Sequence, residues 1–310
     1  MKFLLGMNAV VACLALACGS DDQSDPSSTP TGAGGSAMDT AAAGGDRSVS
    51  TTPDPQYLPA ATGTCPEIVD GTVTFAPAGI PERDVEIYLR DAAFGTDGPL
   101  IFYWHGTGSS PDEPRYGLGP AMDPILDAGG IIAAPFHDPD AGNWPWFLTV
   151  GSGREDDLIL ADEILACAIE SVGVDLRRIH SVGMSAGGLQ TAQMSYRRSG
   201  YVASVVSYSG GRIGDPPQQE MDNKFAAMIL HGGPEDTAFI VSFQEVSVGY
   251  RDDLRGKGHF AFLCNHNLGH TIPIDARHAV GQFLADHPFG TLPSPYEPAL
   301  PETFPNYCAL

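Results

Sequence analysis

The feature that most constrains this chain is a serine set among glycines, Gly183-Met184-Ser185-Ala186-Gly187-Gly188. An apolar stretch at 178–182 precedes it, and a stretch of helical character at 189–196 follows it. A serine on a sharp strand-to-helix turn needs glycine on both sides, because larger side chains would collide where the strand and the helix nearly touch. The pattern therefore predicts a nucleophile elbow that presents Ser185 at the end of a buried strand.

The apolar pattern around the elbow predicts an α/β fold. Segments 72–75 and 85–89 alternate between apolar and polar residues, as the strands of a half-exposed hairpin do. Nearly continuous apolar runs indicate parallel strands buried on both faces, and they lie at 99–104, 130–134, 179–182, 203–208, 226–230 and 261–264. Apolar stripes at helical spacing lie at 157–171 and 275–284. We expect a mostly parallel central sheet with an antiparallel N-terminal hairpin and helices on both faces.

A serine hydroxyl becomes a good nucleophile when an imidazole takes its proton and a carboxylate orients that imidazole. In this architecture the acid follows the serine in the chain, and the histidine comes last. Asp236 is the predicted acid, because it follows the apolar run at 226–230 and sites form at the carboxyl ends of parallel strands. The neighbouring Glu235 is the alternative.

The predicted base is a histidine in the loop after the last apolar run. His270 has a glycine before it and a threonine after it, and a helix is expected from about residue 275. His266 lies in the same loop and is the alternative base. Of the remaining histidines, His278 and His287 are expected at surface positions of helices.

Two backbone N–H groups are expected to stabilise the negative oxygen of a tetrahedral intermediate. The first belongs to Ala186, directly after the predicted nucleophile. The second is expected from Thr107 in the loop His105-Gly106-Thr107-Gly108, which follows the strand ending at Trp104. In such a loop the histidine is expected to brace the backbone and not to act as a base.

The segment 135–147 follows another predicted strand and contains Trp144 and Trp146. These two side chains are predicted to line a cleft for an acyl chain or an aromatic ring, and the alternative is that they pack the loop onto the protein body. Asp138 and Asp140 in this segment are too few for a calcium loop, so no metal is expected. No cofactor is expected either.

The N-terminus is expected to direct export. Lys2 and the apolar run after it predict a signal peptide at 1–17, and Leu14-Ala15-Leu16-Ala17-Cys18 is similar to the lipobox of bacterial lipoproteins. Cys18 is the predicted lipidation site, and Cys13 or an ordinary secretory signal is the alternative. Residues 18–62 are rich in Ser, Gly, Pro and Ala and are expected to form a flexible tether. The catalytic domain is then 63–310.

Charge and cysteine usage support this interpretation. The chain has 16 Lys plus Arg against 38 Asp plus Glu, a net charge of -22, which argues against nucleic acid as a partner. A membrane is expected to be contacted only through the lipid. The four cysteines outside the N-terminal segment predict two disulfides in an oxidising compartment, with three pairings open among Cys65, Cys167, Cys264 and Cys308.

Taken together, the motifs HGTG, DLRRIHSVGMSAGG, HGGPEDT and GHTIP resemble the α/β-hydrolase fold, and within it the polyhydroxybutyrate depolymerase and feruloyl esterase group. The resemblance covers roughly residues 85–288. It implies a serine esterase with the triad Ser185, Asp236 and His270, acting through an acyl-enzyme on hydroxyalkanoate, aryl or feruloyl-type esters. Two alternatives stay open: a lipid-tethered binding protein on an inactive scaffold, and a peptidase of the same fold.

Overall fold

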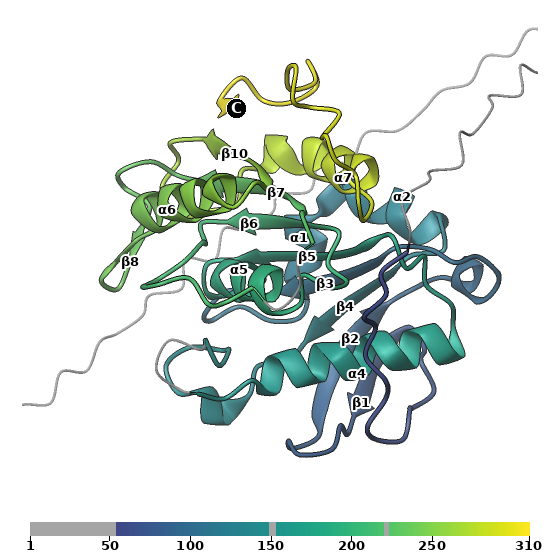
Figure 1. Ribbon diagram of the computed structural model, residues 1–310. Coiled ribbons are helices and arrows are strands. Elements are labelled where there is room, and N and C mark those ends of the chain that lie inside the picture. Colours follow the sequence, from purple (N-terminus) through teal and green to yellow (C-terminus); the bar gives the residue numbers. More distant parts are fainter. Residues whose placement is uncertain (1–53, 149–152, 220–222) are drawn as a thin grey trace, which may run out of the picture. The chain divides into compact units, whose positions relative to one another are not determined.

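The computed structural model describes residues 54–148, 153–219 and 223–310, and all of them belong to one unit, Val49–Leu310 (Figure 1). The predicted signal peptide, both candidate lipidation sites and most of the predicted tether lie outside the described residues. Near the start of the first described range, Leu58 and Ala61 pack against the core. The backbone N–H of Thr62 donates a hydrogen bond of 2.7 Å to the carboxylate of Glu163. The last residues of the segment predicted as tether therefore contact the folded unit.

A nine-stranded sheet forms the centre of the unit, in the order β1-β2-β4-β3-β5-β6-β7-β10-β11. The six strands from β4 to β10 in this order pair in parallel, whereas β1 with β2, β2 with β4 and β10 with β11 are antiparallel. The mostly parallel sheet with an antiparallel N-terminal hairpin is thus confirmed. The strands are β1 (Gly71–Phe75), β2 (Arg83–Tyr88), β3 (Leu100–Trp104), β4 (Ile131–Pro135), β5 (Ile179–Met184), β6 (Ser204–Tyr208), β7 (Ala226–His231), β10 (Phe260–Asn265) and β11 (Cys308–Ala309).

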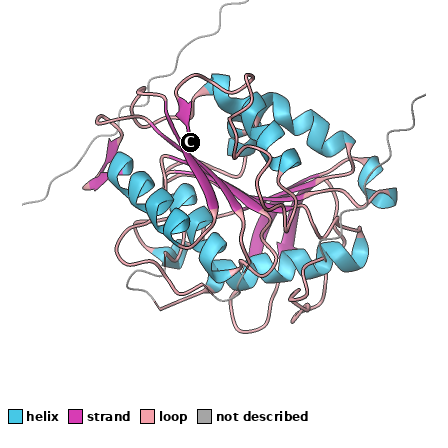
Figure 2. Cartoon of the chain, turned by 45° about the horizontal axis from the view of Figure 1, so that its top comes forward, coloured by secondary structure: helices cyan, strands magenta, loops and turns pink. Residues whose placement is uncertain are grey.

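Helices cover both faces of this sheet, as predicted (Figure 2). Because neighbouring residues of a strand point to opposite faces, each strand contributes to two separate cores. One core joins the sheet to α4, α5 and α6, and the other joins it to α2 and α7. The helices are α1 (Glu113–Gly117), α2 (Met122–Asp127), α4 (Asp156–Ser171), α5 (Ala186–Arg197), α6 (Phe243–Gly256) and α7 (Arg277–Asp286).

Three helices agree with the sequence analysis and the others were not predicted. The stripes at 157–171, 189–196 and 275–284 correspond to α4, α5 and α7. By contrast, α1, α2, α6 and the short hairpin of β8 (Thr237–Ala238) and β9 (Val241–Ser242) had not been predicted. Among the described residues, no helix is both long enough and apolar enough to cross a membrane.

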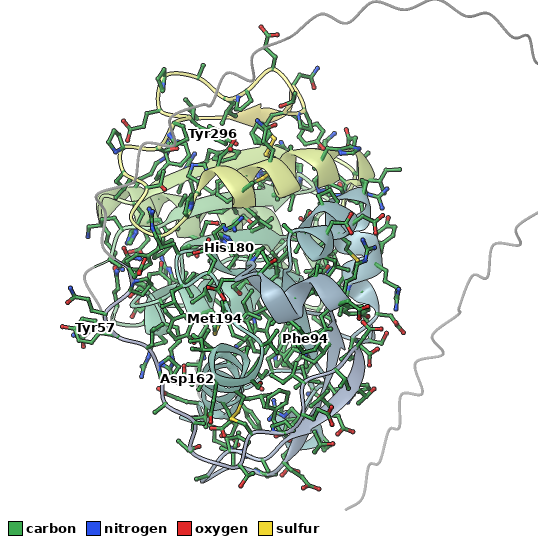
Figure 3. All side chains as sticks on the ribbon, turned by 90° about the vertical axis from the view of Figure 1, so that its right-hand side faces the viewer. Tyr57, Phe94, Asp162, His180, Met194 and Tyr296 are labelled. Carbon is green, nitrogen blue, oxygen red and sulfur yellow. A yellow bond between two sulfur atoms is a disulfide. The ribbon has the colours of Figure 1, made fainter. Side chains whose placement is uncertain are left out.

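Side chains fill the space between the sheet and the helices, with His180 and Met194 inside and Tyr57 at the surface (Figure 3). The prediction of a surface position for His287 was wrong, because this side chain is 1% exposed. Its ring lies 4.7 Å from the ring of Tyr296, in the segment after α7. That segment folds back over the helix and covers the histidine.

Two disulfides connect the four cysteines. Cys65 pairs with Cys167 and ties the N-terminal segment to α4 across 102 residues of sequence. Cys264 pairs with Cys308 and ties the C-terminus to β10, at the edge of the sheet. The structure thereby selects one of the three pairings that the sequence left open.

Candidate active site

Ser185 lies on the turn between β5 and α5. Its backbone has φ 58° and ψ -118°, in the left-handed region that a side chain rarely adopts. A Cβ atom on Gly187 would lie 1.7 Å from the carbonyl oxygen of Trp104, and one on Gly183 would lie 2.3 Å from the carbonyl oxygen of Gly187. Both glycines are therefore required by the close approach of helix and strand, which is the geometry of a nucleophile elbow.

Ser185, His270 and Asp236 form one hydrogen-bonded chain. The Ser185 hydroxyl oxygen lies 2.9 Å from Nε2 of His270, and Nδ1 of His270 lies 2.7 Å from Oδ1 of Asp236. An ionised carboxylate only accepts hydrogen bonds, so Nδ1 carries the ring proton and Nε2 is free to accept one from the serine. The ring of Phe243 packs against the imidazole, with the ring centroids 4.5 Å apart. The arrangement can transfer a proton from Ser185 to His270.

The second oxygen of Asp236 is held by two donors that the sequence analysis missed. Oδ2 accepts hydrogen bonds from the hydroxyl of Ser209 at 2.8 Å and from the backbone N–H of Gly232 at 2.7 Å. The carboxylate itself is fully buried. These bonds fix its orientation toward His270. A serine directly after the end of β6 was the available signal for Ser209, because that strand end lies beside the elbow.

Glu235, the alternative acid, and His266, the alternative base, occupy different environments. Glu235 is exposed, although it is adjacent to the buried Asp236 in the chain. His266 is buried at 7% exposure, and burial lowers the pKa of its imidazole. The Nε2 atom of His266 has no hydrogen-bond partner among the described residues. His266 is therefore a buried histidine of the loop that follows β10.

The loop after β3 passes beside Ser185. Trp104 pairs with Gly183 in the sheet, so the residues after Trp104 continue next to Ser185. A Cβ atom on Gly106 would lie 3.4 Å from Cβ of Ser185. The Gly106 N–H donates to the carboxylate of Glu113 at 3.2 Å, and burial raises the pKa of Glu113. Glu113 was not predicted, because it acts through a tertiary contact with no local motif.

The two predicted oxyanion donors have free backbone N–H groups. A turn closed by the hydrogen bond from Ser109 N–H to Gly106 O, 3.1 Å long, places Thr107 at the bend. Ala186 is the first residue of α5, where N–H groups have no partner within the helix. Within the described ranges, neither N–H donates to another protein group. Both remain available to a bound oxygen.

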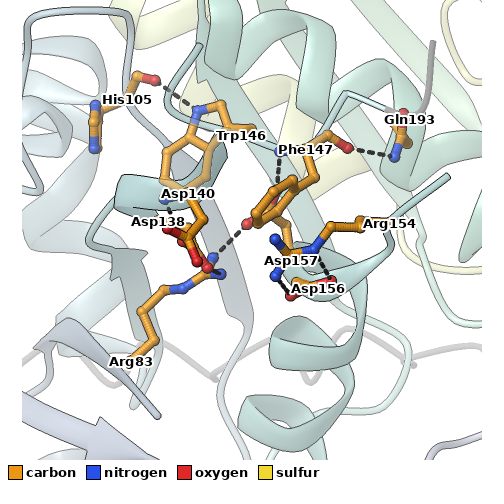
Figure 4. Close-up of polar contacts among 10 residues, drawn as sticks. All are labelled: Arg83, His105, Asp138, Asp140, Trp146, Phe147, Arg154, Asp156, Asp157 and Gln193. Carbon is orange, nitrogen blue, oxygen red and sulfur yellow. Dashed lines mark hydrogen bonds and ion pairs between the residues drawn. The ribbon is translucent and has the colours of Figure 1, made fainter. Parts of the chain in front are cut away.

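His105 and Trp146 connect the loop after β3, which carries the predicted oxyanion donor Thr107, to the segment after β4 (Figure 4). The indole N–H of Trp146 donates to the carbonyl oxygen of His105 at 2.9 Å, and Nδ1 of His105 donates to the carbonyl oxygen of Gly106 at 2.8 Å. Trp146 is 1% exposed and its ring packs edge-on against Trp104. Desolvation by burial lowers the pKa of His105, which keeps the ring neutral.

Buried charges hold this segment to the body of the protein (Figure 4). Arg83 on β2 forms ion pairs with Asp138 and with Asp157 on α4. The second carboxylate oxygen of Asp157 accepts a hydrogen bond of 2.6 Å from the backbone N–H of Phe147. Nowhere in the described part of the chain do three His, Cys, Asp or Glu side chains gather in a group that could hold a metal ion.

A groove of about 690 Å³ lies along α5, and Ser185, Asp236 and His270 are not among the residues that line it. Leu189, one helical turn after Ser185, packs with Val241 and with the same Phe243 that contacts His270, so this end of the groove adjoins the triad. Trp144 and Trp146 both contribute to the lining, but Trp146 is buried and Trp144 is half-buried. The main apolar lining residues are Trp144, Leu148, Leu189, Ile213, Ile240 and Val241.

Comparison with known proteins identifies the fold. No family model and no curated protein matches the chain. Among solved structures, native pOPH superposes with a TM-score of 0.63 at 18% identity, over 79% of this chain and 96% of that one. The chain has the α/β-hydrolase fold. Two further matches are esterase PE8, with a TM-score of 0.52 at 21% identity over 65% of this chain and 97% of that one, and a ferulic acid esterase, with a TM-score of 0.53 at 17% identity over 69% and 95%.

Proposed function

We propose that the protein is a serine carboxylic-ester hydrolase, in which Ser185 is the nucleophile, His270 the general base and Asp236 the orienting acid. The observation that carries the proposal is the unbroken chain of hydrogen bonds from Ser185 through His270 to the buried Asp236. The free N–H groups beside Ser185 and the fold shared with esterases add support. An inactive scaffold has no need to keep the nucleophile, base, acid and oxyanion donors together.

The reaction proceeds in two halves. The Ser185 oxygen attacks the ester carbonyl carbon while His270 Nε2 accepts the serine proton, and the N–H groups of Thr107 and Ala186 bind the negative oxygen of the tetrahedral intermediate. Collapse of this intermediate breaks the bond to the alcohol, which leaves with the proton from His270. Water then attacks the acyl-enzyme by the same proton transfers, releasing the carboxylic acid and restoring Ser185.

The substrate class belongs to the same proposal: esters of hydroxyalkanoic, aryl or feruloyl type. The apolar lining of the groove suits a carbon chain or an aromatic ring, with half-buried Trp144 as the contact residue and buried Trp146 as its support. One neighbour of the same fold is a ferulic acid esterase. A groove of about 690 Å³ has the volume for a short acyl chain, so we expect a polymer to bind by its end.

The test compares the two adjacent carboxylates on p-nitrophenyl butyrate. In Asp236→Asn the amide oxygen is needed to accept from Ser209 and Gly232, so the amide NH2 group faces Nδ1 of His270 and favours the wrong ring tautomer. Such changes lower kcat by about 10⁴-fold in serine hydrolases. Glu235→Gln is the matched control and should keep the wild-type rate, because Glu235 is exposed. A wild-type protein that does not hydrolyse p-nitrophenyl butyrate would favour the inactive binding protein, and faster cleavage of butyryl p-nitroanilide would favour a peptidase.

The proposed function includes export of the protein and its attachment to a membrane. We propose that Cys18 carries a lipid after removal of residues 1–17, and that the following segment tethers the hydrolase to the membrane. The two disulfides are consistent with an oxidising compartment. Cys18→Ser should abolish labelling by an alkyne fatty acid and release the protein from the membrane fraction, whereas Cys13→Ser should change neither. The reverse result would assign the lipid to Cys13.

A further inference from the structure

Arg212 differs from the other arginines of the described chain. All the others donate at least one side-chain hydrogen bond or form an ion pair. The guanidinium of Arg212 has no such partner among the described residues, and its Nε atom is buried. In a chain with a net charge of -22, an unpaired arginine is unexpected, because carboxylates outnumber basic groups.

Arg212 lies at the groove that adjoins the triad. It lines the groove together with Tyr196 and Arg197, which stand near the C-terminal end of α5, while Leu189 lines the end near Ser185. About two helical turns separate Leu189 from Tyr196, or about 10 Å along the helix axis. The groove is thus apolar at Leu189 and basic about 10 Å farther along α5, at the end away from Ser185.

The charged groups near Arg212 leave it available to a ligand. Arg197 is paired with Glu155. Asp253 on α6 lies within electrostatic range of Arg212, but its carboxylate already accepts hydrogen bonds from Lys257 and Tyr196. Asp215 also lines the groove and is exposed. An unpaired guanidinium can donate two parallel hydrogen bonds in a bidentate arrangement, which matches the two oxygens of a carboxylate.

We propose that Arg212 binds a carboxylate at the far end of the acyl chain, so that the preferred substrates are esters of acids that carry a second, anionic carboxyl group. This inference rests on the proposed esterase function and names its substrate class. We assign the groove to the acyl part of the substrate and not to the alcohol part, because the acyl part stays attached to Ser185 until water releases it. A groove along the helix of the nucleophile can hold it through both halves of the reaction.

The experiment compares two chromogenic esters of equal acyl length, p-nitrophenyl hemisuberate and p-nitrophenyl octanoate. Wild-type enzyme should prefer the hemisuberate. Arg212→Gln should lower kcat/KM for the hemisuberate by about 10- to 100-fold, as expected for a lost charge-assisted hydrogen bond, and should change kcat/KM for the octanoate much less. Arg212→Lys should retain part of the preference. Arg90→Gln, outside the groove and exposed, is the matched control and should affect neither ester.

A binding measurement separates this proposal from the esterase proposal. Monomethyl suberate should bind to the Ser185→Ala variant in calorimetry. Adding Arg212→Gln to this variant should raise the dissociation constant by about tenfold or more. Equal binding with and without Arg212, or equal loss on both chromogenic esters, would overturn the role of Arg212. Failure of wild-type enzyme to cleave p-nitrophenyl octanoate together with intact Arg212-dependent binding would overturn the esterase function alone.

Discussion

The indole N–H of Trp146 donates a 2.9 Å hydrogen bond to the carbonyl oxygen of His105, two residues before the predicted oxyanion donor Thr107. This bond joins the segment after β4 to the loop after β3. The position of the Thr107 N–H therefore depends on a side chain that belongs to a different loop, and that loop is itself held by the buried Arg83.

Trp146→Phe should lower kcat more than it raises KM. Phenylalanine keeps an aromatic ring against Trp104 but cannot donate to His105, so the oxyanion loop loses one support. The loss of one such hydrogen bond corresponds to about a tenfold decrease in kcat. Trp144→Phe is the control, and because Trp144 lines the groove it should act mainly on KM. Steady-state kinetics on p-nitrophenyl butyrate would measure both, and an unchanged kcat for Trp146→Phe would show that the bond does not support catalysis.

His270→Ala should remove most of the activity, by about 10⁴-fold or more as in other serine hydrolases, whereas His266→Ala should stay within about tenfold of wild type. The reason is that, of these two histidines, it is His270 that forms a hydrogen bond with the Ser185 hydroxyl. The rate should also fall on acidification, because a protonated imidazole cannot accept the serine proton. Kinetics of the two variants across a pH series test this prediction. An essential His266 with a dispensable His270 would reverse the assignment.

The folded state should lose stability as pH falls below about 6.5, partly through His180. Burial lowers the pKa of His180 to about 3, and repulsion from Arg178 and His287 adds to the effect. Between about pH 6.5 and the lowered pKa, the unfolded chain binds a proton at this site and the folded chain does not, so the free energy of unfolding falls by up to about 1.4 kcal/mol per pH unit.

Urea unfolding at several pH values, followed by tryptophan fluorescence, would measure that slope for wild type and His180→Gln. The variant should show a shallower slope. The slope should not vanish, because burial also lowers the pKa of other histidines, namely His105, His231, His266 and His287. The exposed His278→Gln is the control and should keep the wild-type slope. Equal slopes for wild type and His180→Gln would contradict the prediction.

Both disulfides should stabilise the fold, and Cys65–Cys167 should do so more than Cys264–Cys308. They close loops of 102 and 44 residues of sequence separation. The chain-entropy model assigns about 4.7 and about 4.0 kcal/mol to such loops. Double replacement of each pair by serine, compared in urea at pH 7, would measure the two losses. A larger loss for the C-terminal pair would indicate that its effect is not mainly entropic.

The elbow and the parallel strands could be predicted because their signals are local. Short stretches of sequence are enough to recognise both features. The elbow needs glycines at the close approach of strand and helix, and a strand buried on both faces is a continuous apolar run. Asp236 and His270 could be proposed as partners because the carboxyl ends of parallel strands meet at one edge. The distances of 2.7 Å between Asp236 and His270 and of 2.9 Å between His270 and Ser185 come from the structure.

The remaining features depend on contacts between distant segments. Ser209 and Glu113 act on the site through tertiary hydrogen bonds. The position of Ser209 at the end of β6 was its one sequence signal, and no local motif marks Glu113. Helix α6 was missed because its core-facing row includes Ser247, which weakens the apolar stripe. His287 was misplaced because the segment that covers it follows the helix in the chain.

The central claim is that Ser185 is the nucleophile of an acyl-enzyme, and the most direct measurement is intact-protein mass spectrometry after a brief reaction with p-nitrophenyl butyrate, quenched in acid, with peptide mapping of the adduct. Wild type should carry one butyryl group on the peptide that contains Ser185, His270→Ala should accumulate it much more slowly, and Ser185→Ala should carry none and should not hydrolyse the ester. A butyryl group on another residue, or hydrolysis by Ser185→Ala at a rate near that of wild type, would contradict the account.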